Sequence, residues 1–127
     1  PNMTAALIEE LELILGQMVT VEDEREWLEL NHRFHQRQYE ASGRTRLCGI
    51  LANIRDASSA YMHMVIFEAR KSGRSAIEHQ EILEAIKARD VGSAQRAIVH
   101  HLHQTVEHVL ESLKESEEAT AVPEVAS

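Results

Sequence analysis

The sequence predicts an all-α protein, an antiparallel helical bundle of about five to six helices. Apolar residues recur at spacings of three and four along most of the chain, and no window shows the strict alternation of a half-buried strand. Only five glycines and two prolines interrupt the 127 residues. Long helices with short connections are therefore expected, and short connections place neighbouring helices antiparallel.

Two helices are predicted in the first third of the chain. The first is expected over residues 4–18. Thr20 and Asp23 resemble a capping box that opens the second, and Gly43 is expected to end it. The inward face of this second helix is predicted to carry Trp27, Leu28, Asn31, Phe34, His35 and Tyr39.

Three more helices are predicted after Gly43. Thr45 is expected to cap a long helix that stops at residues 71–73, and Ser75 with Glu78 forms an S-x-x-E capping box for a short fourth helix. Asp90 is expected to cap the fifth. The long helix has the apolar set Leu47, Ile50, Leu51, Ile54, Tyr61, Met62 and Val65. The fifth has the predicted buried stripe Ala94, Ile98, Leu102, Val106, Val109 and Leu113.

Composition divides the chain into a domain over residues 1–114 and an acidic tail over residues 115–127. The tail contains small residues and a proline, which favours disorder. The chain begins directly in a helical pattern, which indicates that an N-terminal portion precedes it. The net charge of −8 and pI near 5.4 argue against a nucleic-acid-binding surface in this segment.

A single cysteine, Cys48, excludes a disulfide within the chain and a thiolate-rich zinc site. A reducing, cytoplasmic location is the simplest interpretation. No apolar run approaches the roughly 18 residues of a membrane span, so no membrane partner is expected.

Histidine is abundant, with eight residues against four percent aromatics. Asn31 and His35 lie four apart, on one face of a predicted helix. His79 shares a face with the apolar residues that follow it, and His101 follows Ile98 by three, so both are expected to point inward. Three histidines and one amide from three helices fit a transition-metal site. The alternative is that each histidine is a hydrogen-bonded packing residue.

The order of the motifs resembles the FCD domain, the effector-binding and oligomerisation domain of FadR-like GntR transcription regulators. That family shows Asp or Asn four residues before the His of an F-H pair, then A-S-G, then S-x-x-E-H-x-x-I-L-x-A-I, an acidic residue opening the last helix, and H-L within it. The matching residues here are Asn31, Phe34, His35, Ala41, Ser42, Gly43, Ser75, Glu78, His79, Asp90, His101 and Leu102.

The resemblance implies a helical bundle whose cavity holds a metal, often zinc or nickel, on Asn31, His35, His79 and His101. It also implies a small organic acid as effector, with Arg55 and His108 as candidate contacts, and a homodimer. Asn31 replaces the family's usual Asp, which removes a negative charge and is expected to weaken metal binding. DNA would be bound only through a winged helix-turn-helix domain that this chain lacks.

Two other functions stay open from the residues alone. A metal-dependent enzyme would use an open coordination position to activate water. No general base is evident beside the histidines, although His108 shares a face with His101. A metal-free helical dimerisation module would use the histidines only for packing. The expected function is a non-enzymatic sensor.

Overall fold

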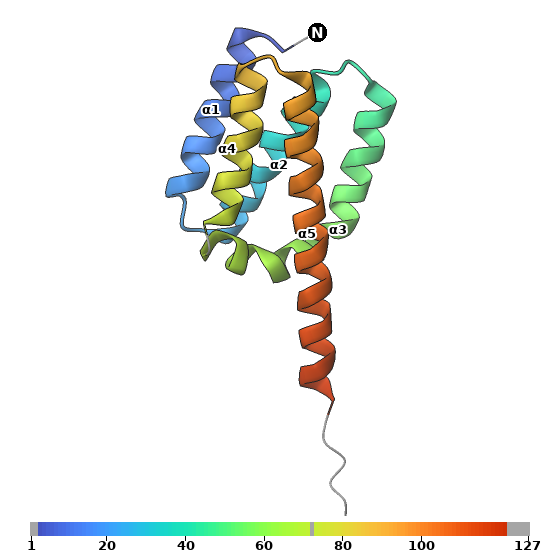
Figure 1. Cartoon of the computed structure of the whole chain (residues 1–127). Helices are drawn as coiled ribbons and strands as arrows, with labels where there is room; N and C mark the ends of the chain where they lie inside the picture. The colour runs from blue at the N-terminus through green and yellow to red at the C-terminus, as the bar shows by residue number, and fades with distance from the viewer. Residues whose placement is uncertain (1–2, 72, 122–127) are drawn as a thin grey trace, which may run out of the picture.

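The computed structural model describes residues 3–71 and 73–121, without the side chains of residues 64–69 and 71. Within these ranges it contains helices α1 (Ala5–Thr20), α2 (Glu24–Glu40), α3 (Thr45–Lys71), α4 (Arg74–Lys87) and α5 (Val91–Thr120), and no strand. The predicted all-α bundle is confirmed (Figure 1).

Aspartate side chains open α2 and α5. Asp90 Oδ1 accepts a hydrogen bond from the Ser93 backbone N–H at 3.0 Å, as predicted. At α2 the cap is Asp23 alone, which accepts from the Arg25 N–H at 2.8 Å. The predicted capping box with Thr20 is wrong, because Thr20 is the last residue of α1 and its hydroxyl donates to a carbonyl one turn earlier.

The predicted capping box at α4 is also wrong. Gly73 precedes the helix with φ of 73°, in the left-handed region that glycine adopts without steric cost, and no side chain caps α4. Ser75 and Glu78 therefore lie inside the first turns of the helix, where both are buried. Their side chains contact histidines instead of the helix terminus.

Helices α1, α2 and α4 form what we call the packed half of the molecule. Their apolar stripes meet in one core, and several of its side chains have no measurable exposure. The buried members of this core are Leu11, Ile14, Leu15, Met18, Trp27, Phe34, Ile82, Leu83 and Ile86. Burial of such side chains is the main source of folding free energy, so the packed half carries most of the stability.

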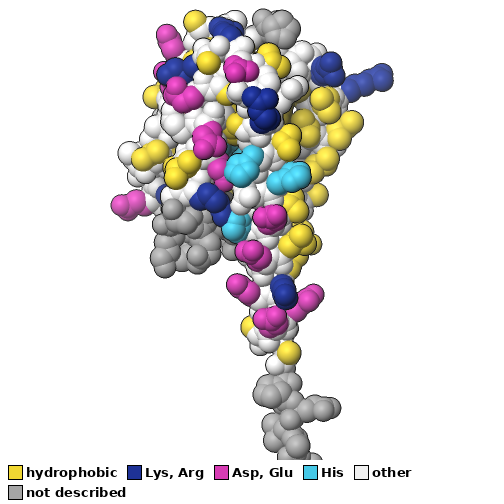
Figure 2. Space-filling view, viewed as in Figure 1, with side chains coloured by type: hydrophobic (Ala, Val, Ile, Leu, Met, Phe, Trp, Pro, Cys, Tyr) yellow, Lys and Arg dark blue, Asp and Glu magenta, His cyan; other side chains and the backbone are white. Residues whose placement is uncertain are grey.

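Helices α3 and α5 form the open half. The predicted buried stripe of α5 is wrong, because none of the described residues of α5 is buried, and four members of the apolar set of α3 are exposed as well. These four are Leu47, Ile50, Ile54 and Tyr61. The side chain of Val65 lies outside the described residues. A helix at the edge of a bundle has neighbours on one side only, so a wide apolar stripe stays partly uncovered. Figure 2 shows hydrophobic side chains along this edge, on the right of the view.

Helix α5 runs past the expected domain boundary at residue 114 and ends at Thr120. Residues 115–120 include three glutamates and one alanine, which are good helix formers. In Figure 1 its lower half extends below the other helices. Residues 122–127 of the predicted tail lie outside the described residues. Among the described helices, none is both long enough and apolar enough to cross a membrane.

Candidate metal centre

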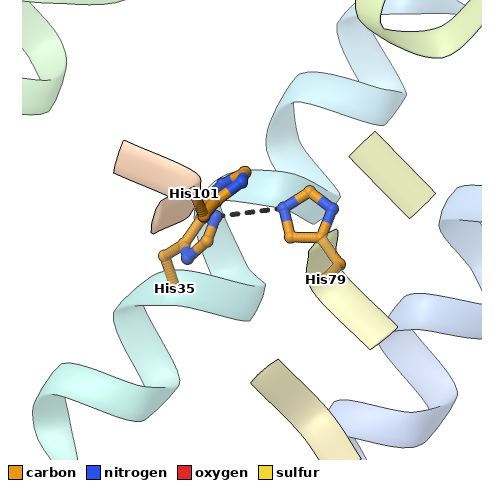
Figure 3. A group of neighbouring side chains, drawn as sticks. All are labelled: His35, His79 and His101. Atoms are coloured by element: carbon orange, nitrogen blue, oxygen red, sulfur yellow. Dashed lines mark hydrogen bonds between the residues drawn. The ribbon is translucent and has the colours of Figure 1, made fainter. Parts of the chain in front are cut away.

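Three histidines from three helices meet where the packed half joins the open half. His35 lies on α2, His79 on α4 and His101 on α5, and their rings point toward one another (Figure 3). His79 is 1% exposed and His35 is 9% exposed. Phe34 contacts both rings edge-on, with centroid separations of 5.4 Å to His35 and 5.2 Å to His79. Packing against Phe34 fixes the orientation of both rings.

The spacing of the imidazole nitrogens suits a shared metal ion. One ligand atom from each of the three residues lies within 4.8 Å of the other two. The Nε2 atoms of His35 and His79 are 3.2 Å apart. Two nitrogens about 2.0–2.1 Å from a tetrahedral zinc are separated by roughly 3.3 Å. The three histidines could therefore hold one ion with little movement.

Asn31 lies one turn before His35 on α2 and lines two cavities. It lines a larger cavity together with His35 and His101, and a smaller one together with His79 and His101. Its Oδ1 atom is buried and has no hydrogen-bond partner among the described residues. An orphaned buried oxygen is costly, by about 1–3 kcal/mol. A metal ion would satisfy it, so the donor set of three imidazoles and one amide oxygen fits a first-row transition metal.

Burial keeps the three imidazoles neutral. It lowers the pKa of His79 to about 3, with the neighbouring His101 adding to the decrease and a hydrogen bond to the Ser75 backbone opposing it. Burial followed by the charges of the other histidines holds the pKa of His35 well below its usual value. Burial also lowers the pKa of His101, although Glu78 opposes this. Neutral imidazoles carry the lone pairs that metal binding requires.

Two further polar side chains hold the rings from behind. Glu78 Oε1 accepts a hydrogen bond from His101 Nδ1 at 3.1 Å. Ser75 Oγ lies 3.2 Å from His79 Nδ1. With Nδ1 engaged in this way, Nε2 is the ligand atom available on His79 and His101, and that of His79 is hydrogen-bonded to His35 Nε2 at 3.2 Å (Figure 3). Both partners come from the first turns of α4, close to His79 in the chain.

The larger cavity, of about 640 Å³, opens beside the histidines between α2, α3 and α5. Arg55 lines it from α3. The Arg55 guanidinium donates to the His32 carbonyl at 3.2 Å and lies 5.5 Å from the centre of the Tyr39 ring. These contacts hold the positively charged guanidinium of Arg55 at the cavity. The apolar walls of the same cavity are formed by Leu28, Leu51, Ile54, Met62 and Leu102. A small amphipathic anion matches this lining.

Comparison with protein families gives one match, to the FCD domain model over residues 1–104. The chain belongs to the FCD domain family. Searches of curated proteins and of solved structures found no match to it. An FCD domain is the effector-binding domain of GntR-type transcription regulators, a regulatory unit and not a known catalytic fold. The resemblance drawn from the sequence motifs is thereby confirmed.

Within this FCD domain the structure gathers the three predicted histidines and places Asn31 beside them. Of the two predicted effector contacts, Arg55 lines the larger cavity and His108 lines the smaller one. His108 Nε2 is hydrogen-bonded to Arg74, and its Nδ1 lies 3.5 Å from Glu111. These contacts tie His108 to charged side chains on α4 and α5.

Sequence reasoning missed Ser75 and Glu78 as parts of the site, because their spacing matched a helix cap. A signal was present in this FCD domain nonetheless. Ser75 lies four residues before His79, which places the two on one helix face. The hydrophobic residues Ile82, Leu83 and Ile86 continue that face into the core. Ser75 is thus on the buried side of α4 whether or not it caps the helix.

Proposed function

We propose that this FCD domain is a metabolite sensor that binds a divalent transition metal on Asn31, His35, His79 and His101. The observation that carries the proposal is that one ligand atom from each of three histidines, on three helices, lies within 4.8 Å of the other two, and that His35 and His101 also line the larger cavity. Zinc and nickel are the metals we favour, because both accept imidazole nitrogen together with an oxygen donor. A bound ion supplies a Lewis-acidic centre with positions left for carboxylate oxygens.

The proposed effector is a small carboxylate. In the larger cavity, Arg55 presents guanidinium N–H groups that suit a carboxylate, while Leu51, Ile54 and Leu102 offer apolar contact to the rest of the molecule. The cavity lies between helices of both halves, so an occupant contacts α2, α3 and α5 together. An effector that fits one arrangement of these helices better than another shifts the population between them.

In the full regulator, this shift is proposed to alter DNA binding by a winged helix-turn-helix domain outside the present chain. A homodimer is part of the same proposal. Its support is an exposed apolar row on α5, spaced by three and four so that it forms one face. The row consists of Val99, Leu102, Val106 and Leu110. A solvent-exposed row of this kind is typical of a protein–protein contact.

The metal is tested by elemental analysis of protein purified without affinity metals or chelators. About one equivalent of zinc or nickel is expected in the wild type and none in a His79→Ala, His101→Ala variant. The matched control replaces His100 and His103, two exposed histidines of α5, by alanine and is expected to keep the metal. Wild-type protein without metal, even after exposure to zinc and nickel, would contradict the proposal.

The effector site is tested by thermal-shift titration of metal-loaded protein with a panel of small carboxylates. Arg55→Gln is expected to weaken the binding of an active carboxylate by about ten- to a hundredfold, because a charged hydrogen-bond partner is lost. The control Arg46→Gln removes an exposed arginine at the start of α3 and is expected to change nothing. Turnover of small acids or esters by the loaded protein would instead favour the enzyme alternative.

Dimerisation is tested by light scattering. A charge placed in the apolar row, by Val106→Glu or Leu110→Glu, is expected to dissociate the dimer. Leu13→Glu is the matched control, because Leu13 is equally exposed but lies on α1 in the packed half. Equal oligomeric states for all three variants would rule out this face as the contact.

A further inference from the structure

The proposed ligands carry no charge of their own. Three imidazoles, which bind metal in their neutral form, and one amide would surround a doubly charged cation among largely buried side chains, where an uncompensated charge is costly. Some nearby negative group is expected to offset that cost. Among the described residues, the carboxylate in contact with one of these ligands is that of Glu78.

Glu78 is placed in an unusual position for a carboxylate. It is 5% exposed and reaches from α4 to α5, where Oε1 lies 3.1 Å from His101 Nδ1. Its other oxygen, Oε2, lies 3.4 Å from the Nε atom of Arg74. The carboxylate of Glu78 thus contacts both the imidazole of His101 and the guanidinium of Arg74.

Glu78 contacts the Nδ1 atom of the His101 ring. Because a carboxylate accepts hydrogen bonds, His101 Nδ1 carries the proton and Nε2 keeps its lone pair. A negative charge behind the ring also makes the lone pair a stronger donor. His79 has only the Ser75 hydroxyl and backbone in the equivalent place, which orient the ring without adding charge.

We propose that Glu78 is the positioning residue of the metal centre: it fixes the tautomer and orientation of His101 and supplies, through that ring, the negative charge that the ligands lack. The inference rests on the proposed metal site and goes beyond it, since it assigns a determinant of affinity to a residue that does not bind the ion. A purely structural alternative is that Glu78 serves only to pair with Arg74 and His101 in the folded chain.

Glu78→Gln separates the two roles. The amide keeps an acceptor oxygen and nearly the same shape, but it removes the charge. Affinity for zinc, measured by competition with a chelating dye, is expected to fall about ten- to a hundredfold. The visible spectrum of the cobalt-substituted protein, which reports ligand geometry and donor strength, is expected to change as well. Ser75→Ala is expected to have the smaller effect, because it removes a neutral partner.

The matched control is Glu84→Gln, the same chemical change on the same helix. Glu84 is 57% exposed and pairs with Lys87, away from the histidines. Its zinc affinity and cobalt spectrum are expected to equal those of the wild type. If Glu78→Gln does not fold, Glu78→Asp takes its place, with a smaller but measurable expected loss, because the shorter side chain withdraws the carboxylate from Nδ1 while keeping its charge.

The outcomes distinguish this inference from the proposed function. Wild-type binding of zinc together with unchanged affinity and spectrum in Glu78→Gln would overturn the role of Glu78 and leave the metal site standing. A variant with a lower melting temperature but wild-type zinc affinity would do the same, in favour of the structural alternative. Failure of the wild type itself to bind zinc, nickel or cobalt would overturn both.

Discussion

The helices of both halves carry apolar residues at the same helical spacing, but the two halves bury these residues to different extents. In the packed half, the stripes of α1, α2 and α4 face one another and side chains such as Leu11 and Phe34 are wholly buried. In the open half, α3 and α5 carry stripes of similar length that leave Ile54 and Leu102 about half exposed beside a large cavity. The comparison teaches that one half supplies stability, while the other keeps the cavity and the exposed apolar surface that the proposed effector and the proposed dimer require.

The largest expected effect tests this division directly. Leu11→Ala removes a fully buried side chain from the packed half and is expected to lower the free energy of unfolding by about 2–5 kcal/mol. Leu102→Ala, in the open half, is expected to cost about 0.5 kcal/mol. Urea unfolding measures both, at concentrations where the chain is monomeric. Comparable losses from the two substitutions would abolish the distinction between the halves.

The next effect is a pH dependence of the free energy of unfolding. It arises from the three histidines that lie where the two halves meet. The pKa of His79 falls from 6.5 to about 3 on folding, and those of His35 and His101 fall too. The unfolded chain therefore binds more protons below pH 6.5. Stability of metal-free protein is present above that pH and is lost as the pH falls toward 3, by up to about 1.4 kcal/mol per pH unit for each histidine.

Urea unfolding of chelator-treated protein between about pH 7.5 and pH 5.5 checks this expectation, because aspartate and glutamate titrate mostly below that window. His79→Leu is expected to reduce the slope. Replacing the exposed His100 and His103 by glutamine serves as the control and is expected to leave it unchanged. A wild-type protein with pH-independent stability over this window would show that the three rings are accessible to protons when folded.

The smallest expected effect lies on the surface of the packed half. Arg37 on α2 donates to both carboxylate oxygens of Glu10 on α1, with its Nε atom 3.1 Å from Oε1. The two side chains are 39% and 32% exposed, so solvent screens the pair. Arg37→Gln is expected to cost less than about 1 kcal/mol, and less again at high salt. A double-mutant cycle with Glu10→Gln isolates the interaction, and a coupling of several kcal/mol would assign the stability of this half to the pair instead of its apolar core.

The helices, and the helix face on which each histidine lies, were predictable because both depend on the spacing of residues along the chain. A residue at i and another at i+4 share a helix face in any fold, so Asn31 with His35 could be paired from the sequence. Short connections also predict that consecutive helices run antiparallel. His79 and His101 were expected to point inward because each shares a helix face with apolar residues, and the structure brings them to His35.

What the sequence could not supply was the number of neighbours around each helix. The apolar stripes of α3 and α5 satisfy the same pattern as that of α1, yet only α1 is covered on its apolar side. The S-x-x-E motif was ambiguous for a similar reason. Whether Ser75 and Glu78 cap a helix or enter the core depends on where the chain turns, and Gly73 places that turn just before Arg74.

His35, His79 and His101 meet from distant parts of the chain, so a shared ion would link those parts together. These residues are far apart along the chain, and α5, which carries His101, has no buried residue to anchor it. An ion bound by all three would act as a removable cross-link that closes two loops of chain, one through α3 and one through the turn at Asp90. Closing loops in this way restricts the unfolded chain and stiffens the folded one. The last helix of the domain, which packs the partly buried Ala94, Ala97 and Ile98 against the core, would then be held in addition by metal coordination.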